Sequence, residues 1–297
     1  MNKEPIRHHY IPQFILKNFC FDNKGHLFYY NKKTSKISKV NTSEIFMGRN
    51  LYRDEKNCPT NPTKIERDFA TFESEVSQII KDRFLYLREI KLSSAECEKL
   101  KLFFALMGFR SKIVSDQFGL KASDQSRKFY TMYQKDGDLS DLWKRNLGYI
   151  VNCRSLSDVL NNNNIDDPIK AFMMRDVFGL CGQYFVIAER KESEQFIITD
   201  TYPTVINGDA FGMQLHLYSI FPISPDRIIL LASIGVENAP RNVVNLRNCV
   251  FTVPKTDYNK NKIMFVKKLY DEEVRFINSV LVKEASEGWA FKDDNKF

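Results

Sequence analysis

The chain has 297 residues, of which 43% are hydrophobic and 27% are charged, and its formal net charge is +7. This length can bury one large hydrophobic core. The longest apolar runs, such as 102–107 and 228–232, are far shorter than the roughly 20 residues of a membrane-spanning helix, which argues against such a helix. No apolar stretch behind the charged N-terminus resembles a signal peptide. We therefore expect a cytoplasmic protein without a membrane partner.

Excess positive charge is concentrated near the N-terminus, because residues 1–60 hold 11 Lys and Arg against 5 Asp and Glu. The basic residues there alternate with aromatic ones. Ammonium groups neutralise phosphates and rings stack on bases, so this pattern favours a nucleic-acid contact surface. A solvated edge strand whose lysines oppose aggregation would show the same pattern. The candidate contact residues are Arg7, Tyr29, Tyr30, Lys32, Lys33, Lys36 and Lys39.

The first 60 residues predict short extended pieces. An Asn-Lys-Gly turn at 23–25 precedes a strand at 26–31, and a second strand at 35–40 would close a hairpin with it. Two prolines within 57–62 then interrupt regular structure. We expect residues 1–60 to form a basic β-hairpin segment.

A helical block is predicted over residues 61–180. Apolar residues from Ile65 to Leu87 recur at spacings of three and four, which indicates one long amphipathic helix. Ser93 and Glu96 have the spacing of a capping box, and the apolar pattern behind them predicts a second helix that continues to Val114. Two such helices joined by a short turn should pack antiparallel. Further helices are expected at 123–134, around Trp143 and at 168–178.

Residues 181–297 form the third segment, which is rich in Ile, Val, Phe and Tyr and predicts strands followed by a closing helix. The chain thus begins with a short β segment, continues with a long helical segment, and ends with strands and a closing helix. This order, without a repeated βαβ unit, indicates an α+β fold. Because an isolated hairpin is marginal in water, the N-terminal strands should join or cover the mainly antiparallel C-terminal sheet of a single domain, 1–297. The strands are expected at 184–190, 195–199, 227–233 and 249–253, and the helix presents Val274, Ile277, Val280 and Leu281.

Four motifs occur in order along nearly the whole chain. They are R-H-H-Y-I-P-Q-F-x-L-x-N-F from Arg7, F-I-I-T-D from Phe196, F-P-I-S-P from Phe221, and V-x-x-I-N from Val274. Together they resemble a widespread bacterial family of unknown function, catalogued as domain of unknown function 4238. That family more often has Asn directly before the proline where this chain has Tyr202. The resemblance implies no assigned reaction and no catalytic residues.

The first motif holds two of the four histidines, His8 and His9. Adjacent side chains of an extended segment point to opposite faces, so one imidazole can face the interior while the other meets solvent or a ligand. The pair can simply tie the N-terminal segment to the helical block through hydrogen bonds. Because the pKa of histidine is near neutrality, general acid/base catalysis or phosphate contact is an alternative role.

Asp200 and Arg110 are the other candidate site residues. Asp200 follows an apolar strand and suits a general base or a metal ligand, although the same residue type also makes turns. A cation held by Asp200 and His9 would need further ligands, with His216 or Asp209 as candidates. Arg110 lies in an apolar helix and should find a carboxylate, such as Asp116 or Glu73, or a ligand phosphate.

The chain lacks a Gly-rich phosphate loop, a Gly-x-Ser-x-Gly elbow and a His-Glu-x-x-His motif, which disfavours the corresponding enzyme classes. The patterns together predict a protein that acts on RNA or DNA, in its most specific form a metal-dependent nuclease, and the family resemblance implies a place in a bacterial defence or toxin system. A Mg²⁺ or Mn²⁺ ion would stabilise phosphate charge while a histidine takes a proton from water. The alternatives are a non-catalytic interaction protein and an enzyme acting on a small molecule. The predicted catalytic residues are His8, His9, Arg110 and Asp200.

The comparison with ββα-metal nucleases, suggested by His-His-x-x-Pro, is incomplete. Such a site needs a hairpin and then a helix that carries a further metal ligand. Here Phe14–Phe19 follows the proline at once, and the next histidine, His26, falls in a predicted strand. The catalytic proposal therefore depends on the N-terminal segment folding back against the late β region, so that all four candidates share one cleft.

Overall fold

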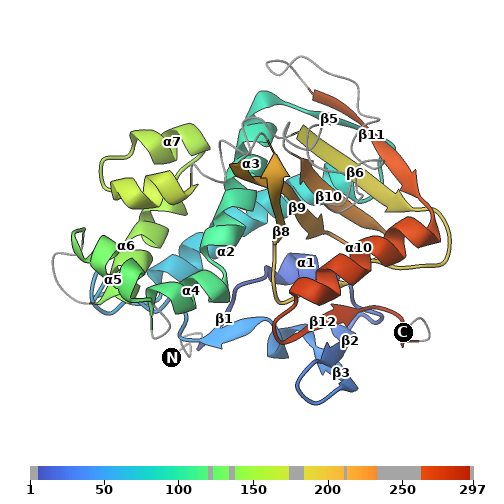
Figure 1. Cartoon of the computed structure of the whole chain (residues 1–297), viewed down its shortest axis with the longest axis horizontal. Coiled ribbons are helices and arrows are strands. Elements are labelled where there is room, and N and C mark those ends of the chain that lie inside the picture. The colour runs from blue at the N-terminus through green and yellow to red at the C-terminus, as the bar shows by residue number, and fades with distance from the viewer. Residues whose placement is uncertain are drawn as a thin grey trace.

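The computed structural model describes residues 6–119, 123–133, 138–173, 184–210, 213–232 and 262–294. A group of helices stands beside a six-stranded sheet, and the N-terminal strands lie below both (Figure 1). This arrangement confirms the predicted α+β class. None of the described helices is long and apolar enough to cross a membrane.

The N-terminal segment forms a ribbon, a short helix and a hairpin. Strand β1 (Arg7–His9) pairs antiparallel with β4 (Met47–Arg49), and α1 (Gln13–Lys17) begins directly behind Pro12. Strands β2 (His26–Asn31) and β3 (Lys36–Asn41) pair as the predicted hairpin. A 3-10 turn, η1 (Thr42–Glu44), follows β3 and is capped by the Asn41 side chain.

The helical block begins with α2 (Lys64–Ile79), which continues as a π-helical turn, η2 (Ile80–Phe84). Helix α3 (Ser94–Phe109) starts at the predicted capping box of Ser93 and Glu96. Ion pairs between Arg83 and Glu96 near one end and between Arg110 and Glu73 near the other show that α2 and α3 run antiparallel, as predicted. The shorter helices are α4 (Lys112–Phe118), α5 (Asp124–Thr131), α6 (Leu139–Ile150) and α7 (Leu156–Asn161).

Two helix boundaries differ from the prediction. The second helix does not continue to Val114, because it ends at Phe109, with Arg110 as its C-cap, and the Ser111 side chain caps the new helix α4. The first helix ends at Phe84 rather than Leu87, and an unpredicted strand, β5 (Glu89–Leu92), lies between α2 and α3. Residues 167–173 are helical, and the rest of the helix predicted at 168–178 lies outside the described residues.

The six-stranded sheet has the order β5-β11-β6-β10-β9-β8, and all pairs except β11 with β6 are antiparallel. The prediction gave β6 and all of β10 but missed β8, β9 and β11, and the strand expected at 249–253 lies outside the described residues. The bounds are β6 (Tyr184–Arg190), β8 (Thr204–Ala210), β9 (Met213–Pro222), β10 (Arg227–Ala232) and β11 (Lys262–Leu269).

A separate four-stranded sheet joins the two ends of the chain in the order β3-β2-β12-β7. Strand β7 (Ile198–Thr199) is shorter than expected, and β12 (Gly288–Phe291) pairs with β2, placing Trp289 opposite Tyr30. The hairpin strands β2 and β3 therefore do join strands from the C-terminal segment, but not those of the larger sheet, while β1 and β4 pair only with each other among the described strands. The predicted closing helix is α10 (Asp271–Glu284), whose buried residues pack with strands of both sheets.

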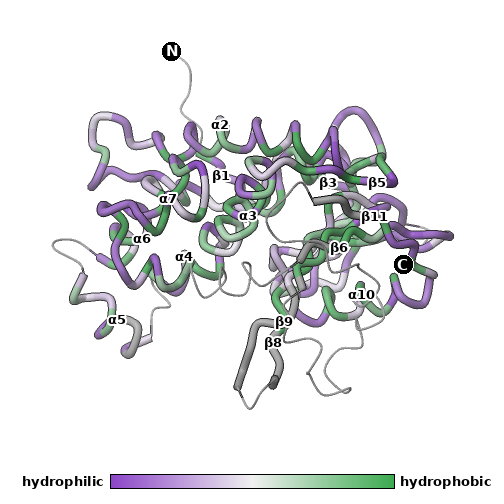
Figure 2. The backbone as a smooth tube through the Cα atoms, turned by 90° about the horizontal axis from the view of Figure 1, so that it is seen from above, coloured by the Kyte–Doolittle hydropathy of each residue, from purple (hydrophilic) through white to green (hydrophobic). Residues whose placement is uncertain are grey.

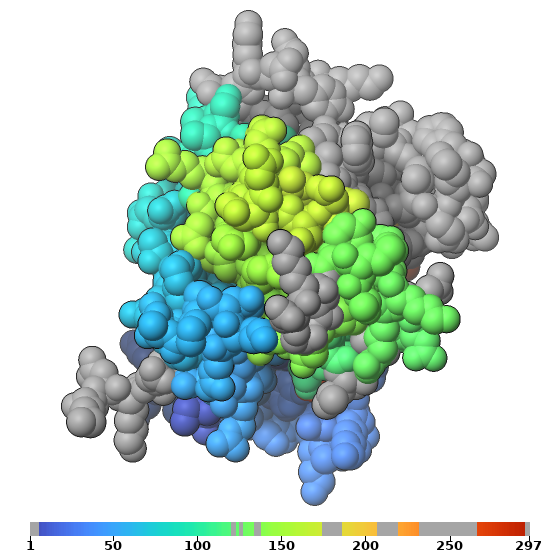
Figure 3. All heavy atoms as spheres, turned by 90° about the vertical axis from the view of Figure 1, so that its left-hand side faces the viewer, coloured from blue at the N-terminus to red at the C-terminus, as the bar shows by residue number. Residues whose placement is uncertain are grey.

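The core continues from the helical block into the larger sheet. The rings of Phe104 on α3 and Phe221 on β9 lie 4.1 Å apart between centroids and join the two parts. Strand β6 lies in the interior and is coloured as largely hydrophobic in Figure 2, and its residues Val186, Ile187 and Ala188 are buried. On the side of the molecule that faces the viewer in Figure 3, the segment after β4 packs on the helices. There the Asn57 amide donates to the carbonyl of Asp141 at 3.1 Å.

Candidate functional site

The β1–β4 ribbon places two arginines opposite each other. Arg7 pairs in register with Arg49, and both side chains are exposed. Within the described part of the chain, neither forms an ion pair with a carboxylate. Like charges directly opposite on a strand pair oppose folding. His9 lies two residues after Arg7 and therefore on the same face, so this outer face gathers two guanidinium groups and one imidazole.

His8 points to the opposite face and is fully buried. Its Nδ1 accepts a hydrogen bond of 2.9 Å from the main-chain N–H of Tyr52, and its ring stacks on the Tyr52 ring with centroids 5.7 Å apart. Because Nδ1 is an acceptor, the neutral ring carries its proton on Nε2. His8 thus has a structural role, as the sequence allowed, but it fastens β1 to the loop that follows β4 rather than directly to the helical block.

His9 is only partly buried. Its Nε2 lies 3.1 Å from the carbonyl oxygen of Thr42, which only an N–H can satisfy, so Nδ1 is the unprotonated nitrogen. The side-chain nitrogen of Gln13 lies 3.4 Å from Nδ1. Burial lowers the pKa of His9, and the charges of Arg110 and Arg7 lower it further, although the bond to Thr42 acts in the other direction. His9 is therefore a neutral imidazole at neutral pH and can accept a proton.

Arg110 is 1% exposed and links several elements. Its guanidinium donates to the carboxylate of Glu73, to the main-chain carbonyl of His9 and, through Nε at 3.2 Å, to the hydroxyl of Tyr52. It also lies 3.8 Å from the ring centroid of Phe69. The predicted carboxylate partner is therefore confirmed as Glu73, and Arg110 and His9 are brought together.

Glu66 belongs to the same cluster and was missed by the sequence reasoning. It lies two helical turns before Glu73 on α2, with Phe69 between them. Its Oε2 is buried and has no hydrogen-bond partner among the described residues. Burial raises its pKa to about 7, Glu73 adds to this effect, and Arg110 opposes it. The available signal was a pair of carboxylates seven residues apart beside the apolar stripe of the helix.

Asp200 anchors a turn. It follows β7, and its carboxylate accepts main-chain hydrogen bonds from Ser286 at 3.0 Å, Glu287 at 2.8 Å and Gly288 at 3.4 Å. Burial nevertheless raises its pKa. These bonds hold the connection between α10 and β12, a distant turn rather than the local turn that the sequence offered as the alternative. The electrostatic influence of Asp200 reaches Tyr10, whose pKa is raised first by burial and then by this carboxylate.

Asp200 and His9, the predicted cation ligands, are not arranged to bind one metal ion together. Both oxygens of Asp200 already accept main-chain hydrogen bonds, and Nε2 of His9 faces a carbonyl oxygen, whereas Mg²⁺ or Mn²⁺ requires converging oxygen or nitrogen lone pairs. Over the described ranges, no three His, Cys, Asp or Glu side chains are grouped to hold a metal ion. The side chains of Asp209 and His216 lie outside the described part.

The aromatic and basic residues of the hairpin mostly make contacts within the fold. Tyr30 stacks on Trp289 with centroids 4.3 Å apart, and Tyr29 meets Phe46 edge-on. Lys32 donates to the carbonyl of Ala285 at 2.6 Å and so caps the C-terminus of α10. Lys39 lies 3.8 Å from Asp22 and over the ring of Phe21. Lys33 and Lys36 remain exposed on the surface.

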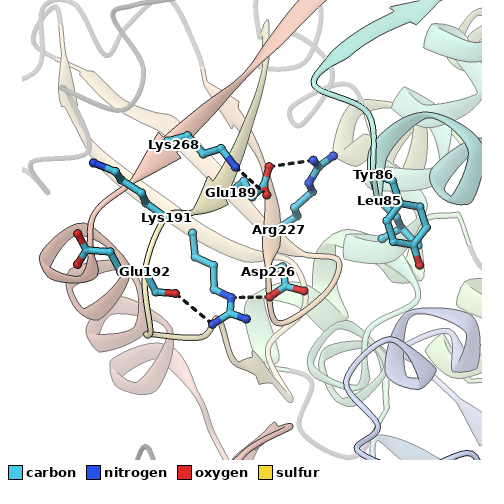
Figure 4. Close-up of a pocket in the computed structure, with 9 residues that line it drawn as sticks. Leu85, Tyr86, Glu189, Lys191, Glu192, Asp226, Arg227 and Lys268 are labelled. Carbon is cyan, nitrogen blue, oxygen red and sulfur yellow. Dashed lines mark hydrogen bonds and ion pairs between the residues drawn. The ribbon is translucent and has the colours of Figure 1, made fainter.

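A separate open pocket of about 370 Å³ lies between the end of η2 and the larger sheet (Figure 4). Its wall holds Glu189, which Arg227 reaches at 2.9 Å and Lys268 at 2.8 Å. Arg227 is buried and also donates to the carbonyls of Phe84 at 2.7 Å and Leu87 at 2.8 Å. The pocket contains none of the predicted site residues, and its charged groups join the sheet to the helical block.

The structure thus defines an α+β protein in which a buried arginine and two glutamates support a basic β-ribbon. The family described as "Protein of unknown function (DUF4238)" matches residues 7–295, so the chain belongs to this family. No curated protein and no solved structure matches the chain.

Proposed function

We propose that this protein acts on nucleic acid and binds its phosphate backbone on the outer face of the β1–β4 ribbon. The observation that carries the proposal is the register of Arg7 opposite Arg49, with His9 on the same face. Guanidinium groups bind phosphate oxygens through paired N–H donors. A phosphate between the two arginines would offset the repulsion that the ribbon otherwise carries. The register of the two arginines favours the ribbon over the aromatic face of the hairpin as the proposed contact surface.

The proposed reaction is phosphodiester hydrolysis. Nδ1 of His9, once the Gln13 amide moves aside, takes a proton from water, and the water oxygen forms a bond to phosphorus. The phosphorus–oxygen bond to the leaving sugar breaks, and that oxygen takes its electron pair and receives a proton from solvent. Arg7 and Arg49 stabilise the charge that develops on the phosphate oxygens. His8, Asp200 and Arg110 hold the structure around this face.

A second candidate is a non-catalytic interaction protein. The observation that favours it is that both imidazoles already bond to main-chain groups, His8 to Tyr52 and His9 to Thr42. In that case the ribbon binds an anionic partner without chemistry. The two candidates agree on the binding face and differ only in the role of His9.

Binding is tested with labelled single-stranded RNA and DNA at about 50 mM and about 200 mM salt, since phosphate contacts make affinity fall with salt. A double variant, Arg7→Ala with Arg49→Ala, should bind more weakly. The plot of log K against log salt should also become less steep, by about 1.4 for two lost contacts to a single strand. The matched control is Lys33→Ala with Lys36→Ala, which removes the same charge from the hairpin and should change affinity less. A larger loss in the control would instead place the contact surface on the hairpin, and wild type that binds neither nucleic acid rejects the proposal.

Cleavage is tested with RNA, single-stranded DNA and plasmid, each in the presence of EDTA, Mg²⁺ or Mn²⁺. We expect His9→Ala to bind but not to cleave, while the control His26→Ala, which removes an imidazole paired with Asp22 on the hairpin, cleaves like wild type. Equal cleavage by wild type and His9→Ala rejects the catalytic role. Binding without cleavage by wild type supports the second candidate.

A further inference from the structure

One peptide group of the ribbon is held from two sides. The carbonyl of His9 accepts a hydrogen bond from Arg110, and the N–H of the same peptide group, which belongs to Tyr10, donates to the carbonyl of Phe46 at 3.1 Å. Arg110 thus fixes the end of β1 and the orientation of the His9 backbone. Any change in the partners of Arg110 acts directly on this peptide group.

Two carboxylates lie near Arg110, but its guanidinium pairs with only one of them. Glu73 takes the ion pair, while Glu66, on the same face of α2, keeps a buried oxygen without a hydrogen-bond partner among the described residues. One guanidinium cannot fully neutralise two partly buried carboxylates, and an ionised carboxylate whose buried oxygen has no partner is unfavourable. Glu66 must therefore hold a proton or compete for Arg110.

We propose that Glu66 is a positioning residue for His9 that acts through Arg110. With its proton, Glu66 leaves the guanidinium on Glu73 and on the His9 carbonyl. Without its proton, Glu66 attracts the guanidinium, which then releases the His9 carbonyl and loosens the end of β1. The consequence for nucleic acid rests on the function proposed above, but the movement of Arg110 does not.

The charged and titratable groups around Glu66 come from three places. Helix α2 supplies Glu73, the end of α3 supplies Arg110, and the loop after β4 supplies Tyr52, while His9 on β1 lies beside Arg110. Burial raises the pKa of Tyr52 to about 12 and lowers that of His9, so neither changes its charge on going from neutral to mildly alkaline pH. Because burial raises the pKa of Glu66 to about 7, the proposed exchange falls near neutral pH.

The experiment measures main-chain hydrogen exchange of free protein at pH values of about 6 and about 8.5. The reporting amides are those of Tyr10, bonded to Phe46, and Tyr52, bonded to His8. Wild type is compared with Glu66→Gln at each pH, so that the intrinsic pH dependence of exchange cancels. We expect equal rates at the lower pH, and at the higher pH exchange at Tyr10 about tenfold faster in wild type, as the loss of one hydrogen bond would give. The amide of Val151, bonded to Leu147 in the helical block, should not differ.

A second variant should change the exchange rate of the Tyr10 amide in the opposite direction. In Glu73→Gln the guanidinium loses its ion-pair partner, so Glu66 should ionise and take it at both pH values, and exchange at Tyr10 should be fast throughout. Glu75→Gln is the matched control, since Glu75 is an exposed residue of the same helix that pairs with Lys99. Equal exchange at Tyr10 in wild type and Glu66→Gln at both pH values, or slow exchange in Glu73→Gln, overturns the proposal.

Binding of labelled RNA under the same conditions separates this inference from the proposed function. If both hold, wild-type affinity falls at the higher pH and that of Glu66→Gln does not. A difference in exchange without any binding of nucleic acid supports the role of Glu66 and rejects the proposed function. Binding of nucleic acid without any difference in exchange supports the proposed function and rejects the role of Glu66.

Discussion

The guanidinium of Arg110 donates a hydrogen bond to the main-chain carbonyl of His9, which stands 101 positions earlier in the chain. One side chain at the end of α3 thereby fixes the backbone of the strand that carries the histidine pair. Since the same guanidinium also binds Glu73 on α2, it connects the N-terminal ribbon to both long helices.

Arg110→Ala should destabilise the protein by about 3–5 kcal/mol, because it leaves a largely buried carboxylate and a carbonyl without their partner. Arg110→Lys should lose about 1–3 kcal/mol, since an ammonium keeps the charge but cannot serve three acceptors in the planar geometry of the guanidinium. Urea unfolding measures both. The control is Arg83→Ala, whose side chain pairs with Glu96 at the surface and should contribute below about 1 kcal/mol. Equal losses at the two arginines would contradict the central position of Arg110.

Glu66 should make stability depend on pH. Its pKa is about 7 in the folded protein and near the ordinary 4.5 in the unfolded chain, so the folded state binds the proton more tightly. The free energy of unfolding should therefore decrease as pH rises from about 4.5 to about 7, and then level off. Because the side chain is partly exposed, we expect this group to contribute about 2 kcal/mol. The difference in unfolding free energy between wild type and Glu66→Gln, followed over this range, isolates the effect, and a constant difference would contradict it.

Asp200→Asn should lower stability by about 2–3 kcal/mol, because a carboxylate that accepts several main-chain bonds is replaced by a neutral amide with one acceptor oxygen. Cleavage or binding of nucleic acid per folded molecule should stay unchanged if Asp200 only anchors the turn before β12. Thermal unfolding and the RNA assay together measure the two effects. Asp226→Asn, at an exposed carboxylate paired with Arg190, is the control for stability. Loss of cleavage in a folded Asp200→Asn protein would restore Asp200 to the active site.

Gly288→Ala should disrupt the four-stranded sheet. A Cβ at this position would lie 2.1 Å from the carbonyl oxygen of Tyr30, so the backbone of β12 or β2 would have to shift. We expect a loss of at least about 2 kcal/mol. Gly148→Ala is the control, because a Cβ there would meet Ile65 at an ordinary 3.6 Å, and alanine in a helix should add about 0.5–1 kcal/mol. Thermal unfolding of the two variants compares these opposite effects.

Local patterns predicted the elements whose signals lie within one turn or one strand. The capping box of Ser93 with Glu96 is in place, and so are the hairpin and the apolar face of α10. The break at Arg110 was missed because the apolar pattern continues across it, while the cap that restarts the helix depends on the single hydroxyl of Ser111. Strand β5 was missed because its partner, β11, lies far along the sequence.

The candidate site was only partly predictable for the same reason. The sequence indicated the histidine pair and the need of Arg110 for a carboxylate, both of which follow from residue type and helix face. The role of Asp200 depended on which backbone amides a distant turn would present, and no local pattern contains that information. Glu66 was overlooked because a carboxylate near the start of a helix is ordinarily solvated, whereas in the folded protein one oxygen of Glu66 is buried near Arg110 and Tyr52.

The pairing of β12 with β2 has a consequence for how the protein is made. The last strand of the chain must lie beside one of the first, and Lys32 must reach the C-terminus of α10, before the small sheet is complete. During synthesis, the hairpin of β2 and β3 therefore leaves the ribosome long before its neighbouring strand exists. Completion of this sheet has to wait until Gly288–Phe291 has been synthesised, so a chain truncated before Gly288 would have a hairpin that lacks its neighbouring strand.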